Sequence, residues 1–352
     1  MKPLHATLRA HRALLLLVVL YAIAAAVLVG HAPSEQDMLG VFAGFFFASL
    51  TGAVFSLCGY AIYVMLFVRP DRLCHFLYHS LRRYLNRERL LQALPVLLML
   101  PLFATSFTVV KAAIPHFHAY TWDARLAAWD LALHGGTAPW AWLQPVFGHP
   151  LITAMLNFAY HLWFFLFYAL IYWLALDTRR PLLRMQFLLS FVLSWIILGS
   201  VVAMLFASAG PCYYGYLHVG PDPYAPLMAY LHEANQHFPI WALQVQDMLW
   251  DGYRNGGPAS ELGISAMPSM HVATAVLMAL LGWQLGRRVG IALTAFAVLI
   301  LLGSVHLGWH YALDGYVGAA GATLLWQLVG WALRPAKARA GVTGMRGERL
   351  AS

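Results

Sequence analysis

Long apolar runs separated by short polar segments dominate the chain. Eight of them are 17 residues or longer, and they cover residues 13–29, 39–68, 91–110, 151–176, 186–208, 266–285, 289–309 and 311–333. A helix of about 20 apolar residues is long enough to cross the hydrocarbon core of a bilayer. The pattern therefore predicts an all-α integral membrane protein, a helical bundle with about eight transmembrane helices.

Lys and Arg fall almost entirely between alternate runs, and this spacing predicts the topology. Nineteen of the 22 basic residues lie in 1–12, 69–89, 177–184, 287–288 and the segment after 333. Basic residues collect in the cytoplasmic loops of membrane proteins, so we expect both termini to lie inside (N-in, C-in). The net charge of +8 is then explained by the orientation of the chain in the membrane, and it does not indicate a nucleic-acid partner.

The composition narrows the class of protein. Hydrophobic residues make up 61% of the chain and charged residues 10%, and the mean hydropathy is +0.66. Soluble domains carry about 25% charged residues, so a soluble enzyme, a disordered chain and a disulfide scaffold are excluded. Cys58, Cys74 and Cys212 are far apart and predict no disulfide framework. HAPSEQD, not a small-residue cleavage site, follows run 13–29, which argues against a signal peptide.

The runs divide the chain into three parts. Residues 1–90 hold two N-terminal transmembrane helices and a basic cytoplasmic loop, 91–333 a six-helix core, and 334–352 a basic cytoplasmic tail. Two outer segments are not simple spans. Segment 111–150 contains the amphipathic stretch WDARLAAWDLALHGG, which we expect in the membrane interface. Segment 209–264 is rich in Pro, Gly and aromatic residues, and a loop of this length is usually functional.

The first chemical motif is SAMPSMH, which opens the sixth run. Pro268 suits the first turn of a helix, and the free amides of that turn with the helix dipole favour an anion. Ser269 adds a hydroxyl there, and His271 is placed to give or take a proton. The alternative is a helix that begins at proline and carries a buried histidine without catalytic function.

The second motif is HLGWHYALD, at the boundary of the last two runs. His310 and Asp314 are four residues apart, so we expect them on one helix face. Asp314 then holds one imidazole N–H and directs the other nitrogen outward, as in an activated nucleophile or base. Two alternatives stay open: a His–Asp pair that only packs two helices, and a metal site that adds His306. The topology brings this motif and His271 to the same outer membrane face.

Together, SAMPSMH and HYALD resemble the type 2 phosphatidic acid phosphatase superfamily. More narrowly, they are similar to the branch that includes inositol phosphorylceramide synthases and their bacterial relatives. The resemblance implies that 91–333 is a catalytic core acting on phosphate esters without a metal ion or cofactor. It implies that His310 is the nucleophile that forms a phosphohistidine, that Asp314 orients it, and that His271 protonates the leaving oxygen. Ser269 and the nearby amides would hold the phosphoryl oxygens.

The sequence departs from the family in its phosphate-binding cations. Many members carry Lys, six residues, then Arg-Pro, but Ile62, Trp173 and Gln327 stand where that lysine would precede the three Arg-Pro pairs. We expect Lys111 to replace it, since it is the only lysine between Lys2 and Lys337 and ends the third run on the outer side. Arg254 is the second candidate. The alternatives are a snorkelling interfacial lysine and a solvated loop arginine.

These observations predict a lipid phosphatase or phosphotransferase that acts on a lipid-linked phosphate at the outer membrane face. The partners expected are the bilayer and the lipid substrate; the oligomeric state is left open. The compact loops favour a bacterial inner (plasma) membrane, with the active site facing the periplasm. The rival is a secondary transporter or proton-coupled channel that uses the His–Asp cluster as a relay. Such a protein would spread ionisable residues through several spans and often has repeated halves.

Overall fold

α-Helices form the whole framework of the protein in the computed structural model, which describes residues 2–30, 38–255 and 262–334. Within these ranges no residue belongs to a β-strand. The long helices are α1 (Lys2–Val29), α2 (Met38–Tyr63), α4 (Arg87–Phe117), α7 (Pro150–Leu176), α8 (Pro181–Ile196), α12 (Met270–Leu285), α13 (Arg287–His306) and α14 (Ala312–Leu333). The shorter helices are α3 (Leu73–Tyr84), α5 (Asp123–Leu133), α6 (Pro139–Phe147), α9 (Ala203–Leu205), α10 (Ala225–His237) and α11 (Trp241–Asn255).

Every predicted run corresponds to a long helix, which confirms the all-α membrane class. Within the described residues, seven helices are long and apolar enough to cross a membrane. The sixth run is the exception: α12 is apolar but has 16 residues, a length of roughly 24 Å against a hydrocarbon core of about 30 Å. Residues 266–269 of that run are not helical. The count of eight spans therefore stays a prediction.

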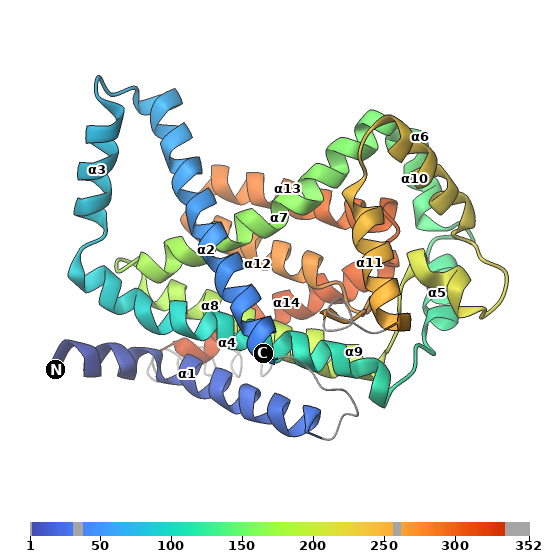
Figure 1. The fold of residues 1–352 in the computed structure, drawn as a ribbon, viewed down its shortest axis with the longest axis horizontal. Helices are drawn as coiled ribbons and strands as arrows, with labels where there is room; N and C mark the ends of the chain where they lie inside the picture. The colour runs from blue at the N-terminus through green and yellow to red at the C-terminus, as the bar shows by residue number, and fades with distance from the viewer. Residues whose placement is uncertain (1, 31–37, 256–261, 335–352) are drawn as a thin grey trace, which may run out of the picture.

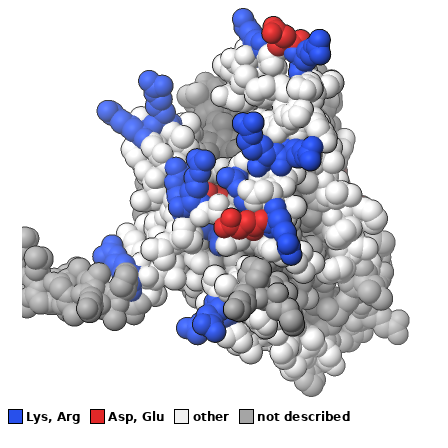
Figure 2. Space-filling model, turned by 90° about the vertical axis from the view of Figure 1, so that its left-hand side faces the viewer, with Lys and Arg blue, Asp and Glu red and all other residues white. Residues whose placement is uncertain are grey.

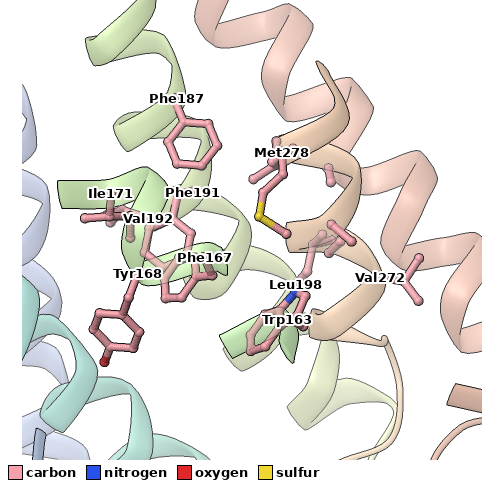
Figure 3. Close-up of a cluster of buried hydrophobic side chains, with 14 of the residues drawn as sticks. Trp163, Phe167, Tyr168, Ile171, Phe187, Phe191, Val192, Leu198, Val272 and Met278 are labelled. Carbon is pink, nitrogen blue, oxygen red and sulfur yellow. The ribbon is translucent and has the colours of Figure 1, made fainter. Parts of the chain in front are cut away.

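The hydrophobic core involves most of the long helices, and a central part of it lies between α7, α8 and α12 (Figure 3). Trp163 stacks on Phe167 with ring centroids 5.6 Å apart, and Phe167 meets Phe191 of α8 at 5.0 Å. Met278 of α12 is fully buried. In contrast, the span that begins in α2 buries only 11% of its apolar window inside the protein. A helix that is apolar but exposed in this way suits contact with lipid.

The two ends of the bundle differ in charge and in construction. Lys and Arg gather on the face at the left of Figure 1, which Figure 2 shows directly. This is the end where α1 begins, α3 lies and α12 turns into α13. Short helices α5, α6, α10 and α11 cover the opposite end (Figure 1). The structure thus brings the predicted basic segments together, except that the tail 335–352 lies outside the described residues.

The outer segments form more regular structure than the sequence predicted. The segment 111–150 contains the end of α4, then α5 and α6, and 209–255 contains α10 and α11. That WDARLAAWDLALHGG lies in the membrane interface stays a prediction, but the structure shows that its two carboxylates point inward. Asp123 is 0% exposed and Asp130 is 1% exposed. A buried carboxylate needs hydrogen-bond partners, and both residues find them on segments that flank the site described below.

Candidate active site

A cavity of about 490 Å³ opens beside the first turn of α12, at the end of the bundle away from the basic face. Aromatic and other apolar side chains make up most of its lining, which also includes four basic side chains from distant parts of the sequence: Lys111, His161, His271 and His310. Lys111 comes from α4, His271 from α12, and His310 from the connection between α13 and α14. The structure therefore brings together three of the residues predicted from sequence.

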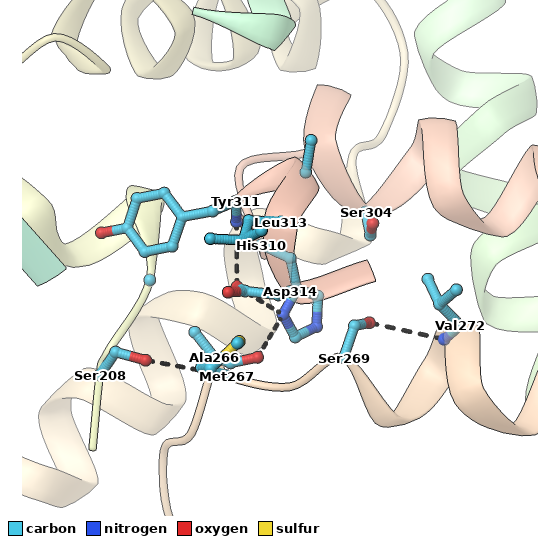
Figure 4. A network of polar contacts seen from close by, with 12 residues as sticks. Ser208, Ala266, Met267, Ser269, Val272, Ser304, His310, Tyr311, Leu313 and Asp314 are labelled. Carbon is cyan, nitrogen blue, oxygen red and sulfur yellow. Dashed lines mark hydrogen bonds and ion pairs between the residues drawn. The ribbon is translucent and has the colours of Figure 1, made fainter. Parts of the chain in front are cut away.

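His310 lies in a loop, since α13 ends at His306 and α14 begins at Ala312. The expectation that it shares a helix face with Asp314 was wrong, although the two side chains still meet, with Nδ1 3.4 Å from Asp314 Oδ2. The closer partner of Nδ1 is the carbonyl oxygen of Ala266, at 2.8 Å (Figure 4). A carbonyl only accepts, so Nδ1 carries the proton. Nε2 is then the unprotonated nitrogen, and it has no hydrogen-bond partner among the described residues.

Asp314 caps the start of α14 and also lies beside His310. Its Oδ2 accepts a hydrogen bond from the Tyr311 amide at 3.0 Å and completes a capping box at the start of α14. The side chain is 0% exposed. The carboxylate thus fixes the helix start that immediately follows His310 and keeps a negative charge close to its ring.

Main-chain contacts hold the Ala266 carbonyl in place (Figure 4). The Ala266 amide donates to the Ser208 carbonyl at 2.9 Å, and the Met267 amide donates to Ser208 Oγ at 3.2 Å. The Ser269 amide donates to the Asp314 carbonyl at 3.0 Å. Ala266 could not be found from sequence, because the group that orients His310 is a backbone oxygen that any residue carries.

His271 lies in the first turn of α12, and its imidazole contacts two aromatic rings. It stacks on Tyr160 with ring centroids 4.6 Å apart and lies 4.3 Å from the ring of Trp163. Neither ring nitrogen has a hydrogen-bond partner among the described residues. The imidazole is therefore held by ring packing, and its nitrogens are free to exchange a proton with a molecule in the cavity.

Ser269 and Pro268 are placed differently from the prediction. Ser269 is the N-cap of α12, and its Oγ accepts from the Val272 amide at 3.5 Å. Pro268 lies before the cap rather than in the first helical turn. Ser269 is fully buried and does not line the cavity. The hydroxyl oxygen accepts this bond, which does not use its O–H donor, so binding of phosphoryl oxygens by Ser269 stays a prediction.

Of the two predicted cations, the structure brings only Lys111 to the cavity. A close approach of two backbones positions it: Gly263 has φ +64°, and a Cβ there would lie 2.7 Å from the Ala112 nitrogen. This contact lays segment 262–266 along the last turns of α4. Arg254 is exposed near the end of α11 and does not line the cavity. Its proposed role in substrate binding therefore finds no support in the fold.

Two carboxylates of α5 were missed by the sequence reasoning. Asp123 accepts hydrogen bonds from the Ala209 and Gly210 amides and from the Tyr311 hydroxyl, all between 2.8 and 2.9 Å. Burial raises the pKa of Asp123, and these hydrogen bonds oppose that rise. The spacing WDxxxxxWD was the available signal, since it puts two acidic residues two turns apart on one helix face, which is costly in an interface unless partners exist.

Asp130 binds the start of α14, directly after His310 and Tyr311. Its Oδ2 accepts from the Ala312 amide at 3.1 Å and its Oδ1 from the Leu313 amide at 3.0 Å. A carboxylate suits these free amides because the N-terminus of a helix carries partial positive charge. Burial raises the pKa of Asp130, while the two amides lower it. Helix α5 thus holds the C-terminal end of the His310 loop and the start of α14.

His306 points away from this centre. Its Nε2 lies 3.0 Å from Thr153 Oγ1 on α7, so it does not converge with His310 and Asp314. Among the residues that the structure describes, no group of three or more His, Cys, Asp or Glu side chains forms a metal-binding cluster. The metal alternative that used His306 has no geometric basis here.

Comparison with known proteins supports the family predicted from the two motifs. Residues 124–328, more than half of the chain, match the PAP2 superfamily. The chain therefore belongs to the PAP2 superfamily, whose members are generally phosphoric ester hydrolases and phosphotransferases. The matched range contains His271, His310 and Asp314 and excludes Lys111. No curated protein and no solved structure gives a significant match.

Proposed function

We propose that the protein is a membrane-embedded phosphatase or phosphotransferase that acts on a lipid-linked phosphate through a phosphohistidine at His310. One observation carries the proposal: the free Nε2 of His310 lines the same cavity as Lys111 and His271. A nucleophile, a cation and a proton donor at one aromatic-walled cavity are the parts that phosphoryl transfer needs, because that chemistry depends on positioning and charge stabilisation.

Each of these residues has one role in the first half-reaction. Nε2 of His310 attacks phosphorus, and the bond from phosphorus to the leaving oxygen breaks. His271, in its protonated form, gives its proton to that oxygen. The Ala266 carbonyl and Asp314 stabilise the positive charge that develops on the His310 ring. Lys111 offsets the charge on the phosphoryl oxygens, in place of the family's usual Lys and Arg-Pro pattern.

The second half-reaction resolves the phosphohistidine. Neutral His271 takes a proton from water or from an acceptor alcohol, whose oxygen then attacks phosphorus and releases Nε2. Water gives hydrolysis, and an alcohol on a second lipid gives head-group transfer. The resemblance of SAMPSMH and HYALD to the inositol phosphorylceramide synthase branch favours transfer. The aromatic lining of the cavity, with few polar groups to order water, also favours transfer.

The charge distribution supports an outer, periplasmic position for this chemistry. The site lies at the start of α12 and α14, and both helices run from there toward the basic end of the bundle (Figure 1). If basic loops are cytoplasmic, the cavity opens on the opposite side of a bacterial inner membrane. A transporter is disfavoured, because the basic side chains of the cavity gather at one end of the bundle rather than along a path through it.

The test uses purified protein with a panel of lipid phosphates in the presence of EDTA, with free phosphate and new lipid species followed together. His310→Ala is the blank, and Arg254→Gln is the matched control. We expect turnover in the wild-type protein and in Arg254→Gln but none in His310→Ala. Phosphate release identifies a hydrolase, and a new lipid formed only with an added acceptor identifies a transferase. Turnover that persists in His310→Ala, or that EDTA removes, contradicts the proposal.

A further inference from the structure

A second cavity lies at the opposite, basic end of the protein. Its volume is about 700 Å³, and it is lined by α3, the first turn of α4 and the turn between α7 and α8. Four arginines and two histidines contribute to its wall: Arg72, His75, His79, Arg83, Arg89 and Arg179. Asp71 is its one acidic lining residue among the described residues. A concave surface with one sign of charge concentrates the field and attracts counter-ions.

The guanidinium groups of this cavity lack carboxylate partners. Within the described residues, no salt bridge joins any of these four arginines to an aspartate or glutamate. Asp177 is nearby, but its Oδ1 accepts from the main-chain amide of Arg179 at 2.9 Å. Arg89 is held by its own neighbour, with its guanidinium carbon 4.0 Å from the ring centroid of Tyr84. Four positive groups therefore face one space, which an anionic ligand would neutralise.

The position of α3 indicates a ligand that comes from the membrane. In Figure 1, α3 stands at the end of the bundle, between the ends of α2 and α4, and runs across the direction of α4. None of its residues is buried, and its clearest tie to the neighbouring helix is the hydrogen bond between Tyr60 and Ser80, at 2.5 Å. With the apolar windows of the neighbouring α2 and α4 in the bilayer, a helix in this place would lie at the level of the lipid head groups. Pro70, Phe76 and Tyr84 add apolar surface to the cavity wall.

We propose that this cavity binds the phosphate head group of an anionic phospholipid, and that the bound lipid ties α3 to the rest of the bundle. An arginine guanidinium can donate two parallel hydrogen bonds to two oxygens of one phosphate. Basic pockets at the cytoplasmic end of a helical bundle also suit such head groups. The glycerol end of the lipid would contact the apolar part of the wall, and its acyl chains would lie along α2. The inference is independent of the reaction proposed for the other cavity.

The experiment is a native mass spectrometry titration of the purified protein. The probes are dioleoylphosphatidylglycerol, dioleoylphosphatidylcholine and inorganic phosphate. The test variant is Arg83→Gln with Arg179→Gln. The matched control is Arg287→Gln with Arg288→Gln, two exposed arginines of the same face that do not line the cavity. The variant His310→Ala is included to separate this site from the active-site cavity.

We expect the wild-type protein, the control pair and His310→Ala to bind one phosphatidylglycerol more tightly than phosphatidylcholine. In the test variant this affinity should fall roughly 30-fold, with inorganic phosphate binding weakly throughout. If Arg83→Gln with Arg179→Gln fails to fold, Arg83→Lys with Arg179→Lys keeps the charge and loses the forks, and it should bind with intermediate affinity. An equal loss in the control pair, no preference for phosphatidylglycerol, or equally tight binding of inorganic phosphate overturns the proposal.

Discussion

His310 owes its reactive tautomer to a main-chain oxygen. The Ala266 carbonyl, 2.8 Å from Nδ1, accepts the proton-bearing side of the ring, and Asp314 stands slightly farther away at 3.4 Å. A carbonyl acceptor keeps its role at any pH at which the protein is folded, because it does not titrate. The aspartate then adds charge stabilisation as the ring becomes positive.

Replacing Lys111 by glutamine should weaken catalysis without unfolding the protein. The glutamine side chain is one atom shorter, stays polar and loses the charge that faces the cavity. We expect kcat/KM for a lipid phosphate to fall roughly 10- to 100-fold, the value of one charge-assisted hydrogen bond of about 1.5–3 kcal/mol. Steady-state kinetics on Lys111→Gln and on the exposed control Arg254→Gln measure it. Equal losses in the two variants would remove Lys111 from the site.

Replacing Asp130 by asparagine should destabilise the loop that carries His310. The amide side chain has one acceptor oxygen and an NH₂ group, so one of the Ala312 and Leu313 amides loses its partner. An unmade buried hydrogen bond costs about 1–3 kcal/mol, so the melting temperature should fall in a thermal unfolding assay. Asp251→Asn, at an exposed position of α11, serves as the control and should melt like the wild type. An unchanged melting temperature in Asp130→Asn would show that α5 does not clamp α14.

At the scale of single residues, the sequence allowed us to predict site residues that have ionisable side chains. His271, His310 and Lys111 were recognised because ionisable groups at membrane depth are costly and usually functional. Ala266 was missed, since its contribution is a carbonyl. Asp123 and Asp130 were missed because their role depends on a fold contact between α5 and two segments more than 80 residues away.

At the scale of helices, the contact between α12 and α14 brings the two motifs together. Gly318 lies on α14 where α12 begins, and a Cβ there would stand 2.6 Å from the Ser269 carbonyl oxygen. That oxygen already accepts from the Ala273 amide, so it cannot move without loosening the start of α12. The absence of a side chain at Gly318 therefore permits the approach on which the site depends.

Substituting Gly318 by alanine should force the two helices apart. Overpacking of this kind costs about 1–3 kcal/mol, and we expect both a lower melting temperature and a lower kcat. Gly59→Ala is the control: its Cβ meets nothing within 4 Å on α2, and alanine is the better helix former by about 0.5–1 kcal/mol. Thermal unfolding in the same detergent compares the two. Equal stability of the two variants would contradict close packing of α12 on α14.

The apolar runs predicted the long helices well, because spans depend on local composition. The short helices α5, α6, α10 and α11 were not resolved, since their residues are mixed in polarity and their partners lie elsewhere in the chain. The break between α13 and α14 was also displaced: the predicted boundary lay at residue 310, whereas residues 307–311 all lie outside helices. Glycine and a buried hydrogen-bond network set that break, and neither shows in a hydropathy pattern.

At the scale of the whole molecule, the account predicts that the basic face and the site lie on opposite sides of the membrane. Cys74 is an exposed cysteine of α3 at the basic end. Val219 is exposed in the segment between η3 (Pro211–Leu217) and α10. In a chain that carries Cys58→Ala, a membrane-impermeant maleimide added to intact cells should not label Cys74. Val219→Cys, tested in a chain that also carries Cys74→Ala, should be labelled. Labelling of Cys74 from outside would reverse the proposed orientation.

The central claim is that His310 becomes covalently bonded to phosphorus during turnover. The most direct measurement reacts the protein with a lipid phosphate for a few milliseconds, quenches the reaction in alkali and locates the phosphorylated peptide by mass spectrometry. The account predicts an alkali-stable, acid-labile adduct on His310, trapped longer in His271→Ala with a substrate whose leaving group needs no protonation. Turnover without any such adduct, or an adduct on another residue, would contradict it.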